Sequence, residues 1–198
     1  MGSREEMLES LRRNAPREVP RPDLSSLGIH YDDKVVQFAS ALKGVGGNCL
    51  EVEDLLAAHR ALSEQPFYRE AKRVVSLVPG VGHANVDPSA IAEPRELEGL
   101  DLAVLPGELA VAENGAVYVD GAVLVQRALY VIAEHLVLVV GAGAVVNDMH
   151  EAYARLATRP VGYGLFISGP SKTADIEQAL VIGAQGARSC TVLLVRSQ

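Results

Sequence analysis

Short apolar runs alternate along this chain with segments in which apolar residues recur at helical spacing. Runs of Val, Leu and Ile with little intervening charge are typical of strands buried on both faces of a sheet. Such runs cover residues 49–52, 74–78, 102–105, 136–140, 165–167 and 191–195. The helical spacing covers residues 32–44, 55–62, 146–156 and 175–182. This order predicts an α/β fold with an open, mostly parallel sheet that is flanked by helices.

The first 31 residues have a different pattern. Met7, Leu8 and Leu11 form a thin apolar stripe, which predicts a short helix. Three prolines between residues 16 and 22 then interrupt any periodic structure. We therefore expect residues 1–31 to form a helix and a proline-rich arm, and residues 32–198 to form one domain.

The most informative stretch lies near the C-terminus and reads Leu-Phe-Ile-Ser-Gly-Pro-Ser-Lys-Thr-Ala-Asp-Ile-Glu. Its apolar start predicts a strand, which Gly169 and Pro170 end. Thr173 is a suitable N-cap for a following helix, and Asp175 would place a carboxylate in the first turn, where the helix dipole favours it. The segment therefore predicts a strand, a tight loop and a helix.

This loop is a candidate anion site. The first N–H groups of a helix have no intrahelical partner, and Lys172 adds a positive charge beside them, so a phosphate or carboxylate would fit. A well-capped turn without a ligand accounts for the same residues. A P-loop is excluded, because Ser171 stands where that motif requires glycine before its lysine.

A second informative stretch covers residues 109–125. Asn114 and Gly115 form a strong turn dipeptide between two apolar segments, which predicts a β-hairpin. Asp120 and Gly121 offer another turn into a further strand. Glu113 stands among apolar residues at the first turn, where burial would favour its protonated form or prepare it as a nucleophile.

Two further side chains are candidates for chemistry. Arg127 precedes an apolar run and either faces an anionic ligand or lies at the surface. His135 opens a predicted strand and would form an acid–base pair with Glu113 if the fold brought them together. We expect no metal site, because neither His150 nor Glu151 has a histidine or carboxylate at the spacing of a metal pair.

The composition narrows the classes of partner. The chain carries a net charge of −7 and contains no Trp, which disfavours nucleic acid and anionic membranes as partners. Cys49 and Cys190 are its two cysteines, too few for an iron–sulfur cluster. The N-terminal segment lacks the apolar core of a signal peptide, and the most apolar region is too short to span a bilayer. We therefore expect a cytoplasmic protein.

The stretch over residues 168–177 resembles the glycine-proline-serine-arginine-threonine-alanine-aspartate-isoleucine-glutamate signature of the LUD domain family, which includes lactate utilization protein C. Lys172 replaces the arginine that is usual in that family. Residues 112–115 resemble the family's alanine-glutamate-threonine-glycine motif except at Asn114. Ala133 replaces a proline, and residues 185–187 replace a histidine-glycine-proline motif.

The same turn resembles the serine-glutamate-asparagine-glycine motif of class I coenzyme A transferases, whose glutamate attacks the acyl-CoA carbonyl. Both families are associated with one α/β superfold, that of ribose-phosphate isomerases, glucosamine-phosphate deaminases and coenzyme A transferases. The resemblance therefore implies this fold, whereas the reaction has to be argued from the site.

The resemblance also implies a function. We expect a subunit similar to lactate utilization protein C that takes part in oxidising L-lactate to pyruvate, with the iron–sulfur clusters on partner subunits. We expect a small anionic metabolite to bind between the loop and the turn. The residues expected to bind it are Asn114, Gly115, Arg127, Gly169, Pro170, Ser171, Lys172, Thr173 and Asp175. Two alternatives stay open: an acyl-CoA transferase or hydrolase that uses Glu113, and a non-catalytic assembly subunit.

Overall fold

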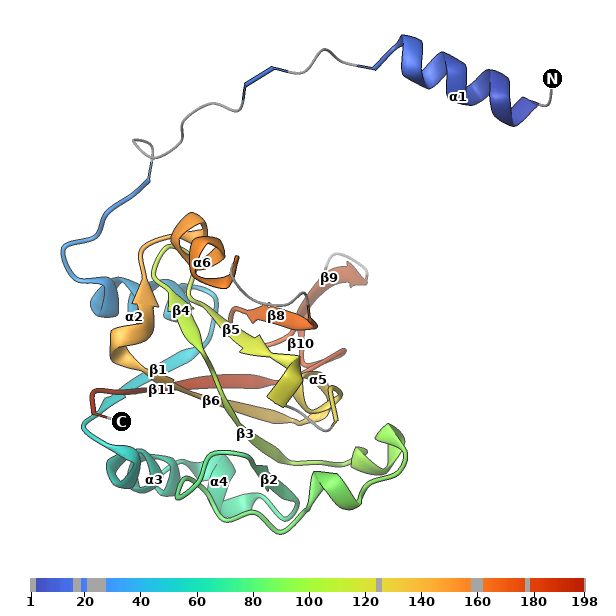
Figure 1. The fold of residues 1–198 in the computed structure, drawn as a ribbon. Coiled ribbons are helices and arrows are strands. Elements are labelled where there is room, and N and C mark those ends of the chain that lie inside the picture. Colours follow the sequence, from blue (N-terminus) through green and yellow to red (C-terminus); the bar gives the residue numbers. More distant parts are fainter. Residues whose placement is uncertain are drawn as a thin grey trace.

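A parallel sheet of five strands lies at the centre of the described part of the chain (Figure 1). The computed structural model describes residues 3–15, 19–20, 28–123, 126–157, 162–176 and 179–197. In spatial order the strands are β1 (Asn48–Val52), β11 (Ser189–Val195), β6 (His135–Gly141), β3 (Leu102–Pro106) and β2 (Val74–Ser76). The predicted open α/β fold with a mostly parallel sheet is confirmed.

The two central strands β6 and β11 are buried on both faces. Leu136, Leu138 and Val140 of β6 belong to one apolar cluster, while Val137 and Val139 belong to another on the opposite face. This alternation follows from the two-residue period of a strand. Continuous apolar sequence in these strands is therefore what a sheet covered on both sides requires.

Helices cover one face and share the other with a second sheet (Figure 1). Helices α3 (Leu55–Ser63) and α4 (Pro66–Glu70) pack on the first face, where Ala58 and Leu62 are fully buried. Helix α2 (Lys34–Gly44) packs on the second face through Phe38 and Leu42. Its start is fixed by Asp33, whose carboxylate accepts hydrogen bonds from two N–H groups of the first turn.

The second sheet has the order β7–β4–β5–β8 and contains the predicted hairpin. Its strands are β7 (Val145–Val146), β4 (Leu109–Val111), β5 (Ala116–Asp120) and β8 (Gly164–Ile167). One face packs on the central sheet and the other on α6 (Met149–Leu156). Strand β8 pairs antiparallel with β5, so it lies at an edge of this sheet and is only half-buried.

Short helical segments connect the strands of the two sheets. They are η1 (Pro88–Ala90), η2 (Pro94–Leu97), η3 (Gly121–Val123), α5 (Leu129–Ile132) and η4 (Ala142–Ala144). The further strand expected over residues 122–125 is wrong at residues 122–123, which belong to η3, and residues 124–125 lie outside the described part. The carboxylate of Asp120 accepts from the Ala122 N–H, which turns the chain at this point.

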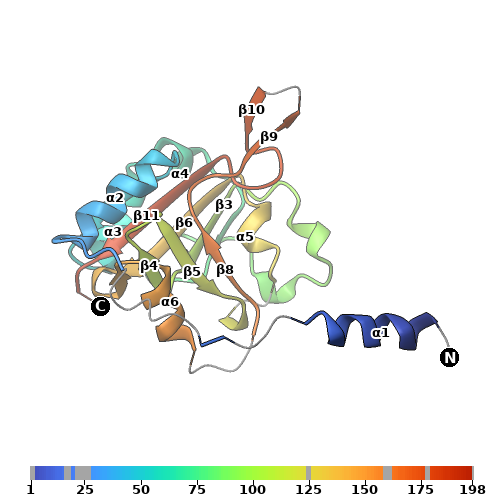
Figure 2. The same cartoon turned by 90° about the horizontal axis from the view of Figure 1, so that it is seen from above.

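The predicted helix over residues 175–182 is also wrong. The chain forms a hairpin there, of β9 (Lys172–Ile176) and β10 (Ala179–Ile182), which pair with each other in a separate sheet. Figures 1 and 2 show this hairpin projecting away from the central sheet. Without a body against which to bury an apolar face, a short helical pattern has little to stabilise it, and β-branched residues such as Val181 and Ile182 favour a strand.

The N-terminal helix is confirmed as α1 (Ser3–Arg13), and none of its residues is buried. Most of the expected proline-rich arm, residues 16–18 and 21–27, lies outside the described part. The domain boundary near residue 32 stays a prediction. Strand β1, which lies soon after that boundary, forms an edge of the central sheet.

Candidate functional site

The two stretches singled out in the sequence meet in space. Strand β8 lies beside β5, and the hydroxyl of Ser168 donates a hydrogen bond to the carbonyl oxygen of Asn114 at 2.7 Å. The side chain of Asn114 turns back and accepts from the Ala116 N–H at 3.0 Å, which closes the hairpin turn. The loop and the turn therefore form one structural unit.

This junction is packed and leaves no room for a ligand at its glycines. Gly115 has a φ of +68°, and a Cβ on it would lie 2.6 Å from the backbone nitrogen of Leu42 in α2. Gly169 has a φ of +75°, and a Cβ on it would lie 2.9 Å from the carbonyl oxygen of Val45. Both glycines thus let the backbone approach α2 closely. Pro170 is buried beside them.

The helix start on which the expected anion site depended is absent. Thr173 and Asp175 lie in β9, where Thr173 pairs with Val181 instead of capping a helix. The Ser171 N–H donates to the carbonyl oxygen of Ala187 at 2.8 Å, and its own carbonyl oxygen accepts from the Gly183 N–H at 3.0 Å. The helical N–H groups from which the anion site at this loop was predicted are therefore not present, and anion binding at the loop stays a prediction.

Lys172 takes part in no ion pair among the described residues. Its side chain is exposed, and its Nζ lies 3.7 Å from the position that a Cβ on Gly46 would occupy. The lysine therefore lies over the end of α2, where the negative end of the helix dipole favours a positive charge.

The contacts of Glu113 and His135 do not join the two side chains. Glu113 is exposed, and its carboxylate accepts from the Met149 N–H at 3.2 Å at the start of α6. His135 is the first residue of β6. Among the described residues no hydrogen bond or ring contact links Glu113 to His135, so their acid–base pair stays a prediction.

His135 has a defined environment of its own. Its Nδ1 lies 2.7 Å from the hydroxyl of Ser189, and its ring stacks on Phe67 with the centroids 4.9 Å apart. Partial burial lowers the pKa of His135 below the ordinary value of 6.5. The ring is therefore held neutral near pH 7.

Arg127 has a contact that favours a structural role. Its guanidinium carbon lies 4.7 Å from the centroid of the Tyr163 ring, which is the geometry of a cation–π interaction. The Arg127 side chain is exposed. Of the two interpretations of this residue, the surface role is therefore the better supported.

A pocket that the sequence did not predict lies at the carboxyl ends of β3, β6 and β11. Its volume is about 440 Å³. The residues that line it are Gly107, Glu108, Gly141, Gly143, Ala144, Val195 and Arg196. We call it the carboxyl-end pocket. In open α/β sheets this edge is where ligands usually bind.

Arg196 supplies the positive charge of the carboxyl-end pocket. It forms ion pairs with Glu51 at 3.0 Å and Glu53 at 3.4 Å. The hydrogen bond that Arg196 donates to Glu51 is the main cause that raises the pKa of Arg196. The walls consist largely of glycine and alanine, so a ligand could reach the backbone directly. The sequence signal that could have located this pocket is the set of glycines at positions 107, 141 and 143, because each follows the apolar part of a strand.

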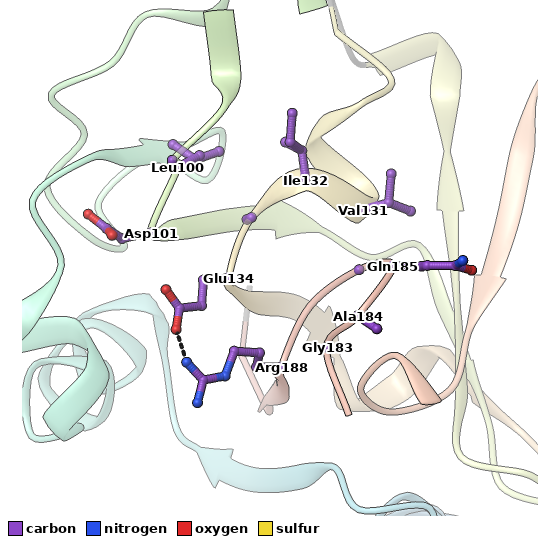
Figure 3. A pocket seen from close by; sticks show the side chains of 12 residues that line it. Leu100, Asp101, Val131, Ile132, Glu134, Gly183, Ala184, Gln185 and Arg188 are labelled. Atoms are coloured by element: carbon purple, nitrogen blue, oxygen red, sulfur yellow. Dashed lines mark hydrogen bonds and ion pairs between the residues drawn. The ribbon is translucent and has the colours of Figure 1, made fainter. Parts of the chain in front are cut away.

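A second pocket lies at the opposite edge of the sheet, where the chain enters β3, β6 and β11 (Figure 3). Its volume is about 410 Å³. The residues that line it are Gly99, Leu100, Asp101, Val131, Ile132, Ala133, Glu134, Gly183, Ala184, Gln185, Gly186 and Arg188. We call it the amino-end pocket. It includes two positions, Ala133 and Gln185, that the sequence marked as departures from a family motif.

Charged groups at the amino-end pocket are partly paired. Arg188 donates to Glu134 at 2.5 Å, and both side chains are substantially exposed. The Oδ2 atom of Asp101 accepts from the N–H groups of Lys72 and Arg73, both at 2.8 Å. The bond from Arg73 is the main cause that lowers the pKa of Asp101. A smaller cavity of about 280 Å³ adjoins this pocket, shares Asp101 and Glu134, and contains His135.

Within the described ranges, no group of three or more His, Cys, Asp and Glu side chains has a geometry that could hold a metal ion. None of the helices described here combines the length and the apolar character that a membrane crossing requires.

Comparison with known proteins gives a family and a structural neighbour. The model of the LUD domain family matches residues 90–195, which is more than half of the chain. The fold is similar to the crystal structure of a DUF162 family protein from Deinococcus radiodurans at 1.70 Å resolution, with a TM-score of 0.64 and 17% sequence identity. The similarity covers 84% of this chain and 99% of that one. No curated protein sequence matches the chain.

Proposed function

The chain belongs to the LUD domain family, and on that premise we propose that it is a lactate utilization protein C-like subunit. It takes part in oxidising L-lactate to pyruvate together with iron–sulfur partner proteins. This oxidation releases two electrons and two protons, so an electron acceptor is required. The two cysteines of this chain are too few to bind a cluster, and the clusters therefore belong to the partners.

We assign a binding role for the small anionic substrate or product to the carboxyl-end pocket. The observation that carries this assignment is the position of the pocket, at the carboxyl ends of three adjacent parallel strands. Its volume of about 440 Å³ is sufficient for a three-carbon acid. Arg196 can donate two parallel hydrogen bonds to a carboxylate.

The ion pairs of Arg196 limit the affinity. Glu51 and Glu53 carry two negative charges against the one positive charge of the guanidinium, and Glu108 in the lining adds another negative charge. A ligand carboxylate therefore has to replace or share one of the ion pairs of Arg196 against this charge. Since exposed ion pairs contribute only about 0–1 kcal/mol, this exchange costs little. We expect dissociation constants of about 1 mM for the isolated chain, with tighter binding where a partner subunit covers the pocket.

Calorimetric titration tests the binding role. L-lactate, pyruvate, inorganic phosphate and acetyl-CoA are titrated separately into the wild-type chain and into Arg196→Gln. Arg155→Gln, an exposed arginine on α6, is the matched control. We expect binding of lactate or pyruvate that Arg196→Gln weakens about tenfold and Arg155→Gln leaves unchanged.

The same series locates the site if the assignment is wrong. Lys172→Ala is included because Lys172 lies at the loop where the sequence first predicted the ligand. A loss of binding in Lys172→Ala with no change in Arg196→Gln would place the acid at that loop and refute the carboxyl-end pocket. If the wild-type chain binds neither L-lactate nor pyruvate in the millimolar range, the proposal that it binds the small anionic substrate or product is refuted.

The β9–β10 hairpin favours a second role, as an assembly subunit. In the described part of the chain its strands pair only with each other, and Val181 and Ile182 are exposed. A two-stranded hairpin is marginally stable in water, and open strand edges are sites at which another chain can add a strand. Co-purification of the chain with its iron–sulfur partners, with and without the double change Val181→Asn and Ile182→Asn, tests this role. Equal recovery of the partners would argue against the hairpin as their contact.

The structure gives no support to an acyl-CoA transferase that uses Glu113. The carboxylate caps the start of α6 at an exposed position, and the lining of neither pocket includes it. Hydroxylamine trapping of a glutamyl thioester in the presence of acyl-CoA checks this conclusion directly. A modified Glu113 in the mass spectrum would restore the transferase as an alternative.

A further inference from the structure

The carboxyl-end pocket is lined by two charged side chains of opposite sign, Arg196 and Glu108. We propose that Glu108 determines specificity in this pocket, because its carboxylate accepts a hydrogen bond from the hydroxyl group of L-lactate and disfavours the keto group of pyruvate. The inference rests on the proposed function, since it requires that Arg196 binds the carboxylate group of the acid. It deepens that function by naming the α-hydroxy acid, rather than the keto acid, as the preferred ligand.

The topology of the sheet places these two residues on opposite sides of the pocket. Arg196 directly follows β11 and Glu108 follows β3 by two residues, whereas β6 runs between these strands. Neighbouring strands lie about 4.8 Å apart, so the two chain segments are roughly 10 Å apart. Both side chains line the same cavity, and they can therefore contact opposite ends of one small acid.

The backbone at Glu108 is held in place by the two sheets. The Gly107 N–H donates to the carbonyl oxygen of Val139 at 2.9 Å, and the Glu108 N–H donates to the carbonyl oxygen of Tyr118 at 2.8 Å. The Glu108 side chain is half-buried, so water and salt screen its charge less than that of a fully exposed side chain. The carboxylate therefore starts from a fixed backbone position, which lowers the cost of ordering it when a ligand binds.

A carboxylate distinguishes a hydroxyl group from a keto group because it only accepts hydrogen bonds. The hydroxyl group of L-lactate has a hydrogen to donate, whereas the keto oxygen of pyruvate is itself an acceptor. Beside Glu108, pyruvate gains no hydrogen bond and places two acceptors against each other. Glu108 also takes part in an interaction within the chain, but the two oxygens of a carboxylate offer about four acceptor sites, which a ligand hydroxyl can share.

The charges around the pocket act in the same direction. Glu51 and Glu53 pair with Arg196. Glu108 adds a third negative charge against the one positive charge of the guanidinium. A ligand atom with partial negative charge, such as the keto oxygen of pyruvate, is therefore disfavoured beside Glu108, whereas the hydroxyl hydrogen of L-lactate is attracted.

Titration of the wild-type chain by two-dimensional ¹⁵N–¹H NMR, at constant pH and ionic strength, tests the inference without any substitution. The probes are L-lactate, pyruvate and propionate, which share the carboxylate group and differ at the second carbon. We expect all three to shift the amide resonances of residues 141–144. L-lactate should bind roughly tenfold more tightly than pyruvate, with propionate between them because it neither donates nor accepts at that carbon.

Matched variants test the side chain itself. Glu108→Gln keeps the shape of the side chain but adds an NH₂ donor, so it should tighten pyruvate and bring the dissociation constants of pyruvate and L-lactate close together. Arg196→Gln should weaken L-lactate and propionate by the same factor, because both use the carboxylate group there. Glu64→Gln, which changes an exposed carboxylate at the end of α3, is the control and should change neither dissociation constant.

The outcomes separate this inference from the proposed function. Equal binding of L-lactate and pyruvate by the wild-type chain, or a ratio that Glu108→Gln does not change, would overturn the role of Glu108 while the acid stays in the pocket. An effect of Glu64→Gln as large as that of Glu108→Gln would attribute the preference to the overall charge of the chain and overturn that role as well. If no probe binds saturably in the millimolar range, the proposed function and this inference are both refuted. Folding of each variant is checked in the same spectra.

Discussion

Replacing Gly115 by alanine tests whether the hairpin motif acts by packing. Gly115 has a φ of +68°, and the added Cβ would lie 2.6 Å from the nitrogen and 2.7 Å from the Cα of Leu42. Both atoms belong to the backbone of α2, so they cannot move aside as a flexible side chain can. The helix itself would have to shift, and Phe38 and Leu42 on it are fully buried.

Two terms add to the expected loss of stability. A left-handed backbone conformation costs a non-glycine residue about 1–2 kcal/mol. Overpacking against a fixed wall costs about 1–3 kcal/mol more. We expect Gly115→Ala to lower the free energy of unfolding by about 2–5 kcal/mol, a large part of the ~5–15 kcal/mol of a typical domain.

Gly80→Ala separates these two terms. Gly80 has a φ of +79°, close to that of Gly115, but a Cβ on it would meet nothing within 4 Å. Only the conformational cost applies there, so we expect a loss of about 1–2 kcal/mol. Urea denaturation followed by circular dichroism measures both variants. Equal losses for Gly115→Ala and Gly80→Ala would refute the argument that the turn is fitted to α2.

Two further predictions concern titratable groups. Burial lowers the pKa of His135, so its NMR titration midpoint should lie below 6.5. The unfolded chain then binds the proton more readily than the folded chain, so the free energy of unfolding should fall as the pH drops below about 6.5. His135→Asn should reduce this pH dependence. A titration midpoint at or above 6.5 would contradict the prediction. Burial also raises the pKa of Cys49 and of Cys190 to about 12, so both thiols should react slowly with iodoacetamide at pH 8 until urea unfolds the chain. Native reaction of either thiol at the rate of free cysteine would show that it is accessible.

The central sheet was predictable because its strands follow a simple physical rule. A strand covered on both faces has to be apolar throughout, and β6 and β11 show this in sequence as uninterrupted Val and Leu. The hairpin of β4 and β5 was predictable because Asn114 and Gly115 favour a tight turn locally. In both cases the information lies within a few consecutive residues.

The helix expected after Lys172 failed because apolar spacing over a few residues does not distinguish a short helix from a strand. Helical spacing predicts a helix only where the apolar face can pack against the body of the protein. The segment instead projects from the fold as β9 and β10. Val181 and Ile182 favour a strand locally, but the projection of the segment depends on the rest of the fold. The error removed the helical N–H groups from which the anion site was predicted.

The pockets were hidden for a related reason. The carboxyl-end pocket is walled by Gly107, Gly141 and Gly143, which have no side-chain chemistry, and its arginine comes from a third segment, after β11. Motifs with conspicuous residues, such as Glu113 and Lys172, drew attention to a junction whose glycines, Gly115 and Gly169, are packed against α2. Because the ends of parallel strands meet at one edge of the sheet, residues directly after each strand come together regardless of type. For this chain, strand ends are therefore a better guide to the two pockets than the family motifs. The glycines of those motifs, Gly115 and Gly169, instead pack the β4–β5 turn and the loop after β8 against α2.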